Sequence, residues 1–222
     1  MENLTLIIPA KKEPESLPYV LMELEKLKLN YLIVLEKSDF VTINAIEKFN
    51  SKIIFQENKG YGDAILLGLK NVKTKYFSIF NADGSFDPYE LKGMYERIER
   101  DSLDLLFASR YKKNSSSEDD TFITFIGNKI FTLIGKILFS LPISDILYTF
   151  VMGDTKKILS LNLKQKDFTL CVELPIIAKK QKLKMSDISA NEKSRIGGIK
   201  KVNEFKDGFL ILTHMICLFL KK

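Results

Sequence analysis

The chain has 222 residues, of which 45% are hydrophobic and 28% are charged, so it can bury a core and is not a disordered chain. Two cysteines and one histidine exclude a disulfide scaffold and a zinc site built from cysteine or histidine side chains. The net charge of +6 suits an anionic partner, such as nucleic acid, a nucleotide phosphate or an acidic membrane surface.

Strand and helix patterns alternate along the first half of the chain, which predicts an α/β fold with a largely parallel sheet. Short β-rich runs lie at 4–9, 31–36, 52–57, 76–83 and 103–109. Helical patterns lie between them at 15–27 and 39–49, after Gly60 and Gly62, and from Pro88 to about residue 101.

The second half begins with a polar, serine- and acid-rich stretch, 112–120, which predicts a mobile loop. The segments predicted after it are a helix at 122–141, a helix around 172–181, a strand around 184–188, a loop at 191–199 and a last helix from about 203. No linker is convincing, so we expect one domain over 1–222. Its parts are a nucleotide-binding half at about 1–111, an acceptor-side half at about 112–205 and a C-terminal amphipathic helix at about 203–222.

The apolar runs of the sequence predict no membrane-spanning helix and no secretion signal. Pro9 interrupts the N-terminal run, and the longest run, 209–220, has 12 residues, whereas a helix needs about 20 to cross a bilayer. The stretch 122–141 is apolar around much of its surface, which fits either a core helix or a helix on a membrane surface. We therefore expect the chain as given to be cytoplasmic, with at most a peripheral contact at the inner face of the membrane.

Polar residues follow each of the five strands predicted in the first half. Ligands of open α/β sheets bind beyond the carboxyl ends of the strands, so five polar turns at one edge indicate a cleft of nucleotide size. These turns contain Glu13, Glu36, Lys59, Asp83 and Arg110.

The turn FNADGSFDP, after the fourth strand, is the most informative of the five. Asp83, flanked by the side-chain oxygens of Asn81 and Ser85, suits Mg²⁺ or Mn²⁺, which prefer oxygen ligands and bridge to diphosphate oxygens. The alternative is a turn stabilised by Asx hydrogen bonds, in which Asp87 caps the helix that begins at Pro88.

In this order, the segments resemble glycosyltransferase family 2, whose members have the GT-A fold, and within it the branch of dolichyl-phosphate mannose synthase. The resemblance covers about residues 4–205 and rests on IIPAKKEPESLP, LIVLEKSD, ENKGYGDAILLGL, FNADGSFDP, LDLLFASRY and RIGGIKK. It implies a mostly parallel central sheet flanked by helices. It also implies metal-assisted, inverting transfer of a sugar from a UDP- or GDP-linked donor, with a polyprenyl phosphate as the acceptor used by that branch.

The resemblance assigns roles by position in this sequence. Asn81, Asp83 and Ser85 would hold Mg²⁺ or Mn²⁺ on the donor diphosphate. Asp83, Asp145 and Glu173 would be catalytic, and for a hydroxyl acceptor Asp145 and then Glu173 would be the candidate general base. The residues that would contact substrate are Pro9, Ala10, Glu13, Glu36, Lys59, Gly60, Asn81, Ala82, Arg110, Arg195 and Lys200.

Two departures from the family pattern leave alternatives open. Asn81 stands where the family has its first metal aspartate, and the segment 148–151 lacks the arginine that the family places after Asp145. A non-catalytic relative that binds a sugar nucleotide or a protein partner is therefore the alternative function. A pyrophosphorylase would need a glycine-rich loop with arginine after the first strand, and a nucleic-acid module would need a basic motif that this sequence lacks.

Overall fold

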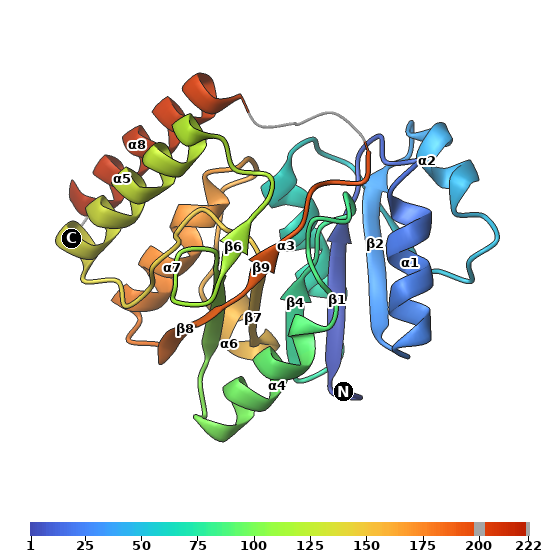
Figure 1. The fold of residues 1–222 in the computed structure, drawn as a ribbon, viewed down its shortest axis with the longest axis horizontal. Coiled ribbons are helices and arrows are strands. Elements are labelled where there is room, and N and C mark those ends of the chain that lie inside the picture. The colour runs from blue at the N-terminus through green and yellow to red at the C-terminus, as the bar shows by residue number, and fades with distance from the viewer. Residues whose placement is uncertain (198–202, 221–222) are drawn as a thin grey trace.

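The computed structural model describes residues 1–197 and 203–220, and its centre is a seven-stranded sheet with strand order β3-β2-β1-β4-β7-β5-β8 (Figure 1). Neighbouring strands pair in parallel except at β7, which runs antiparallel between β4 and β5. The chain places β2 and β3 on one side of β1 and β4 on the other, which creates a switch point where ligands bind in such sheets. The strands are β1 (Leu4–Pro9), β2 (Asn30–Glu36), β3 (Ile53–Gln56), β4 (Tyr76–Ile79), β5 (Leu105–Ser109), β7 (Val151–Asp154) and β8 (Met185–Ser189).

Helices cover both faces of the sheet, and each face has its own apolar core. Because successive side chains of a strand point to opposite faces, Leu6 and Ile8 of β1 lie in one core and Ile7 lies in the other. Helices α1 and α4 pack on the first core, whereas α3, α6, α7 and α8 pack on the second. The helices are α1 (Leu17–Lys26), α2 (Phe40–Ala45), α3 (Tyr61–Asn71), α4 (Glu90–Arg100), α5 (Phe122–Phe139), α6 (Thr155–Ser160), α7 (Leu170–Lys180) and α8 (Glu204–Leu220).

The predicted α/β fold with a mostly parallel sheet is confirmed, and three segments differ from the sequence-based expectation. The predicted loops 112–120 and 191–199 contain the short strands β6 (Ser116–Ser117) and β9 (Asn191–Glu192), which pair with each other in parallel. Strand β7 and helix α6 were not predicted. A four-residue strand that ends in Gly153 and Asp154 shows no alternation of polar and apolar residues, so pairing with β4 and β5 alone defines it.

Helices α5 and α8 lie side by side at one end of the molecule, where Phe139 and Phe219 contact each other with ring centroids 6.0 Å apart (Figure 1). Of the two alternatives left open for 122–141, the structure does not support the core helix, because only Thr132 and Gly135 of α5 are buried. Among the described residues, α5 is also the one helix that is long and apolar enough to cross a membrane, by length and composition alone. That finding differs from the sequence-based expectation, which rested on the shorter run at 209–220.

Candidate active site

A cavity of about 630 Å³ lies beyond the carboxyl ends of β1, β2 and β4 and extends to side chains of α5 and α8. It collects most of the residues predicted to contact substrate. Lys59 does not line it, and Lys200 lies outside the described residues. The predicted residues that line it are Pro9, Ala10, Glu13, Glu36, Gly60, Asn81, Ala82, Arg110 and Arg195.

Glu13 and Glu36 line the end of the cavity beyond β1 and β2, and the family resemblance implies that these two residues would face the nucleobase and ribose of a donor. Glu13 is buried, and its carboxylate accepts a hydrogen bond from the Ser16 hydroxyl at 2.7 Å. Glu36 forms a 2.9 Å ion pair with Lys11, a cavity residue that the sequence did not single out. Lys11 therefore supplies positive charge at this end, next to two carboxylates.

Position 60, at the start of α3, requires a glycine. Its φ is +124°, and a Cβ atom there would lie 2.1 Å from the backbone oxygen of Lys166. The Asp63 amide donates to the same oxygen at 3.0 Å. Glycine is needed at position 60 because the 165–167 loop lies directly against the beginning of α3, and this contact shapes one wall of the cavity.

The turn after β4 contains the predicted metal ligands. Asp83 Oδ1 accepts hydrogen bonds from the backbone amide of Ser85 at 3.1 Å and from its hydroxyl at 2.7 Å. Ser85 is 2% exposed and does not line the cavity, so it orients Asp83 instead of facing a ligand. Asn81 Oδ1 accepts a hydrogen bond from the Tyr61 hydroxyl at 3.0 Å.

These contacts allow a divalent cation at Asp83, although not a closed cage of protein ligands. The described residues contain no group of three or more His, Cys, Asp or Glu side chains that could hold a metal ion. Asp83 Oδ2 accepts no hydrogen bond within the described chain, and Asn81 also lines the cavity. One or two oxygen ligands suit Mg²⁺ that keeps several waters and shares substrate phosphates.

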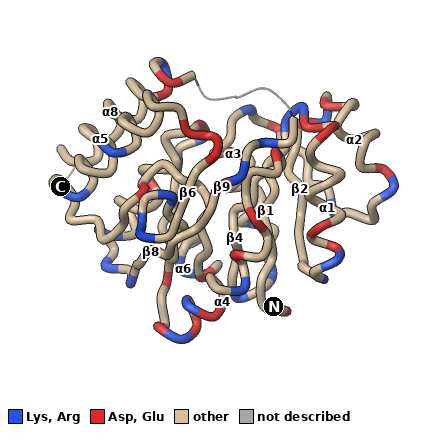
Figure 2. Tube along the Cα trace, viewed as in Figure 1, with Lys and Arg blue, Asp and Glu red and all other residues tan. Residues whose placement is uncertain are grey.

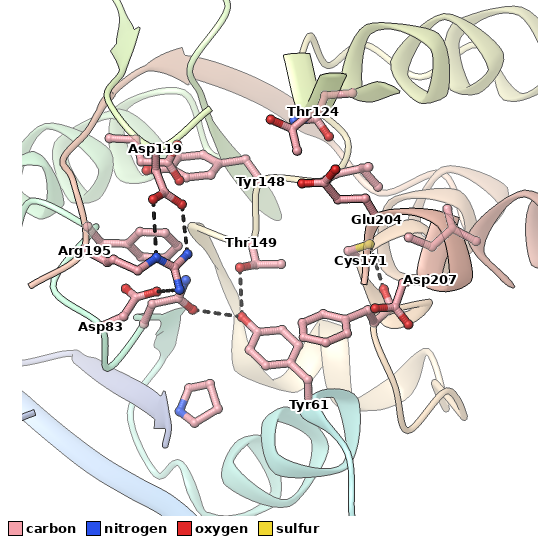
Figure 3. Close-up of a pocket in the computed structure, with 18 of the residues that line it drawn as sticks. Tyr61, Asp83, Asp119, Thr124, Tyr148, Thr149, Cys171, Arg195, Glu204 and Asp207 are labelled. Atoms are coloured by element: carbon pink, nitrogen blue, oxygen red, sulfur yellow. Dashed lines mark hydrogen bonds and ion pairs between the residues drawn. The ribbon is translucent and has the colours of Figure 1, made fainter. Parts of the chain in front are cut away.

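Arg195 lies between Asp83 and Asp119 (Figure 3). Its Nε and Nη2 donate to the two oxygens of Asp119 at 3.3 and 2.8 Å, and these hydrogen bonds raise the pKa of Arg195. Its Nη1 is 3.9 Å from Asp83 Oδ2. The backbone amide of Ile196 donates to the Asp83 carbonyl at 2.9 Å, so this segment lies directly on the predicted metal turn.

Arg110 lines the cavity, but carboxylates surround its guanidinium. It contacts Asp145 at 2.8 and 3.1 Å, Glu192 at 3.2 Å and Asp120 at 3.5 Å. Burial would lower the pKa of Arg110, but Asp145 and Glu192 outweigh it and the pKa is raised. Burial raises the pKa of Glu192, against the opposing effect of Arg110. The charge of Arg110 is thus compensated within the protein.

The two predicted base candidates, Asp145 and Glu173, do not line the cavity. Asp145 is fully buried, and both its oxygens accept hydrogen bonds from Arg110. Glu173 is buried on α7, and its Oε2 accepts hydrogen bonds from the backbone amides of Lys164 and Gln165 at 3.0 and 2.9 Å. In this conformation each carboxylate is bound by these partners outside the cavity, and a catalytic role for either residue stays a prediction.

The other end of the cavity lies against α5 and α8, where apolar side chains predominate, although Thr124, Asn128, Glu204 and Asp207 also line it (Figure 3). A Cβ atom added to Gly127 of α5 would meet nothing within 4 Å, and one added to Gly208 of α8 would meet only the Phe131 ring, at 3.9 Å. Gly127 therefore leaves open space beside α5, whereas Gly208 lies in van der Waals reach of Phe131. The apolar residues that line this end are Ile123, Phe131, Leu147, Phe168, Phe205 and Ile211.

Sequence reasoning missed several cavity residues, namely Lys11, Tyr61, Asp119, Asp120 and Glu192. Asp119 and Asp120 belong to the stretch interpreted as a mobile polar loop. The sequence of such a stretch does not indicate which basic side chains its acidic residues will contact. The arginines that they contact are 76 and 10 positions away along the chain.

A mostly parallel sheet with a carboxylate-bearing turn at its switch point, facing a cavity of this size, is the architecture of the GT-A glycosyltransferases. The sequence model of Glycosyl transferase family 2 matches residues 5–159, and the chain belongs to this family. It is a glycosyltransferase, and the family predicted from the sequence is confirmed.

Similar proteins span most of the chain. An uncharacterized protein of Methanocaldococcus jannaschii is 23% identical over 97% of this chain and 93% of its own length. The UDP-N-acetylglucosamine–dolichyl-phosphate N-acetylglucosaminyltransferase of Methanococcus voltae is 30% identical over 139 residues, which are 60% of this chain and 55% of that protein. The crystal structure of glucosyl-3-phosphoglycerate synthase from Mycobacterium tuberculosis superposes with a TM-score of 0.76 over 97% of this chain and 79% of its own, at 9% identity.

Proposed function

We propose that the protein transfers a sugar from a UDP-linked donor to a polyprenyl phosphate at a membrane surface, the acceptor class used by the dolichyl-phosphate mannose synthase-like branch. One observation carries this proposal. A single cavity joins the polar strand ends, where a nucleotide sugar would bind, to an apolar end beside two helices with exposed apolar side chains.

The similar proteins support UDP and a divalent metal ion on the donor side. The Methanococcus voltae relative is named for a UDP-sugar donor. Structures of the mycobacterial synthase contain Mn²⁺ with UDP or with UDP-glucose, and one contains Mg²⁺ with UDP. We propose Mg²⁺ or Mn²⁺ as the cofactor of this chain, and UDP over GDP as its donor nucleotide.

The polar end of the cavity offers charges that suit a nucleoside diphosphate. Asp83 Oδ2 and the Asn81 amide would hold the cation, which when bound would stabilise negative charge on the departing diphosphate. Arg195 Nη1 makes no hydrogen bond within the described residues and can donate to phosphate oxygens. Lys11 and Glu36, which pair with each other at this end of the cavity, would contact the nucleoside.

The acceptor is argued from the apolar end of the cavity. A phosphate monoester is already ionised near pH 7, so its attack on the sugar needs no general base. This agrees with the placement of Asp145 and Glu173 outside the cavity. A hydrocarbon chain would fit in the open space at Gly127, against the apolar side chains of this end of the cavity.

Membrane contact is proposed from the outer surface of α5 and α8. Figure 2 shows that these two helices carry few charged residues along most of their length. Burying exposed apolar side chains in the interfacial region would stabilise a complex with a membrane, and lysines of α5 would suit anionic headgroups. The exposed apolar residues of α5 are Phe122, Ile123, Phe125, Ile126, Ile130, Leu133 and Ile137.

A transfer assay with purified protein tests the whole proposal. UDP-N-acetylglucosamine, UDP-glucose and GDP-mannose are each offered with polyprenyl phosphate in phospholipid vesicles, with Mn²⁺ or with EDTA. We expect release of UDP and a glycosylated lipid only with a UDP-sugar, Mn²⁺ and the phosphorylated lipid. Equal transfer to a polyprenol without phosphate would contradict the proposed acceptor, and equal activity in EDTA would contradict the metal.

The role of Asp83 has its own test, which does not depend on the acceptor. We expect Asp83→Ala to abolish Mn²⁺-dependent binding of UDP in calorimetry, because Asp83 is the carboxylate of the turn that lines the cavity. Asp87→Ala is the matched control, since Asp87 also accepts a hydrogen bond from the backbone two residues on, at 3.1 Å, but lies outside the cavity. Unchanged UDP binding by Asp83→Ala would refute the assignment.

A further inference from the structure

The acidic run Glu118–Asp120 has no role in the function proposed above, yet each of its members contacts a residue beside the cavity. Glu118 accepts a hydrogen bond from the Ser194 amide at 3.1 Å, and its own amide donates to the Glu192 carbonyl at 3.0 Å. Asp120 contacts Arg110, and Asp119 contacts Arg195. The pairing of β6 with β9 fixes the run beside the 192–195 segment.

Asp119 and Asp83 are the two carboxylates that the described residues place within 4 Å of the Arg195 guanidinium, and only Asp119 is hydrogen-bonded to it. The two carboxylate oxygens of Asp119 accept hydrogen bonds from Nε and Nη2 of Arg195, at 3.3 and 2.8 Å. The 3.9 Å between Nη1 and Asp83 Oδ2 is too long for a hydrogen bond. Figure 3 shows Arg195 turned toward Asp119, with Asp83 on its other side.

The backbone brings Arg195 close to Asp83 whatever the side chain does. The amides of Lys193 and Ile196 donate to the carbonyls of Ser85 and Asp83, both at 2.9 Å. An arginine in this place, without another partner, would hydrogen-bond to the nearest open carboxylate oxygen, because charge-assisted pairs with arginine are strong. That oxygen is Asp83 Oδ2.

We infer that Asp119 is a positioning residue, which holds Arg195 away from Asp83. Its contact leaves Asp83 Oδ2 open for a divalent cation and leaves Arg195 Nη1 open for a phosphate oxygen. Without Asp119, Arg195 pairs with Asp83, and cation binding has to break that pair first. The inference rests on the proposed donor site, since it concerns the same aspartate.

Calorimetric titration of UDP at a series of Mn²⁺ concentrations tests this inference in a double-mutant cycle. Asp119→Asn should raise the Mn²⁺ concentration for half-maximal UDP binding by about tenfold, the order expected when a charge-assisted hydrogen bond must be broken. In an Arg195→Gln background the same change should have little effect, since no guanidinium is left to cover Asp83.

A neighbouring variant separates this mechanism from a general loss of negative charge. Glu118→Gln removes one charge from the same run and keeps an oxygen for the Ser194 amide, so its Mn²⁺ requirement should match that of the unaltered protein. An Asp119→Asn effect that is equally large in the Arg195→Gln background would overturn the inference, because Asp119 would then act on the cation directly. An Asp119→Asn protein with an unaltered Mn²⁺ requirement would overturn it as well.

A crystal structure of ligand-free Asp119→Asn tests the geometry without any assumption about the donor. We expect a nitrogen of Arg195 within about 3.2 Å of Asp83 Oδ2. An Arg195 side chain that stays clear of Asp83 would refute the inference even if UDP proved to be the wrong nucleotide. Absence of UDP binding by the unaltered protein, together with the expected Arg195–Asp83 contact, would refute only the proposed donor.

Discussion

Arg110 forms ion pairs with three carboxylates that come from different parts of the chain. Its side chain is 8% exposed and contacts Asp145, which is completely buried, as well as Glu192 and Asp120. Because removing one partner of a buried ion pair leaves an uncompensated charge, truncating Arg110 should destabilise the fold far more than truncating one partner of a surface pair.

We therefore predict that Arg110→Ala lowers the free energy of unfolding by about 3–5 kcal/mol in urea denaturation, through the charge left on buried Asp145. Arg100→Ala is the control. Arg100 also pairs with an aspartate, Asp101 at 3.0 Å, but on the surface, where solvent screens the pair and truncation should cost much less. Similar losses for the two variants would show that the Arg110 cluster is no more important than a surface pair.

The same cluster explains why residue types at the strand ends were easier to predict than residue roles. Glu13, Asn81 and Asp83 follow strands directly, so their place at the sheet edge is a local property, and they line the cavity. Asp145 was a candidate base by position alone. In the fold its carboxylate is bound to Arg110, 35 residues earlier in the chain, outside the cavity, and no local pattern contains that pairing.

At the scale of elements, α5 and α8 form an apolar surface that the sequence left undecided. Periodicity predicted both helices, but an apolar helix is equally compatible with a core and with a membrane surface. The structure places α5 at one end of the molecule, with most of its apolar side chains in solvent. Helix α8 packs against α7 through Ile211, Met215 and Leu218 and also contacts α5.

This surface gives a prediction about membrane binding. Ile137→Glu on α5 should weaken co-sedimentation with anionic phospholipid vesicles roughly tenfold, because one large apolar side chain no longer inserts. Unfolding should be little affected, since Ile137 is 69% exposed and glutamate is a good helix former. Phe40→Glu on α2, at the other end of the molecule in Figure 1 and 67% exposed, should bind vesicles as the unaltered protein does. Equal loss in both variants would argue against a membrane surface on α5.

At the scale of the whole molecule, the cavity depends on segments from nearly the entire chain, from Pro9 to Ile211. A ligand that binds only the folded protein stabilises it by about 2.7 kcal/mol at one hundred times its dissociation constant. For a chain of this size each kcal/mol raises the melting temperature by about 2–4 °C.

UDP with Mn²⁺ should therefore raise the melting temperature by about 5–10 °C at that concentration, measured by differential scanning fluorimetry. The shift should vanish when EDTA replaces Mn²⁺, and GDP should give less. Larger stabilisation by GDP would reassign the nucleotide, whereas an unchanged shift in EDTA would mean that the diphosphate binds without a cation.

The sequence by itself determined the alternation of strands and helices, the α/β class, the family and the polar turns beyond β1, β2 and β4. These features depend on periodicity and on neighbours within a few residues. Only the tertiary structure decided that Asp119 binds Arg195, that β6 pairs with β9 and that α5 exposes its apolar side chains. The first two depend on a partner that is distant in the chain. The third depends on whether any other part of the folded chain covers α5. The cost of burying a charge or an apolar group is set only when the folded chain brings those partners together.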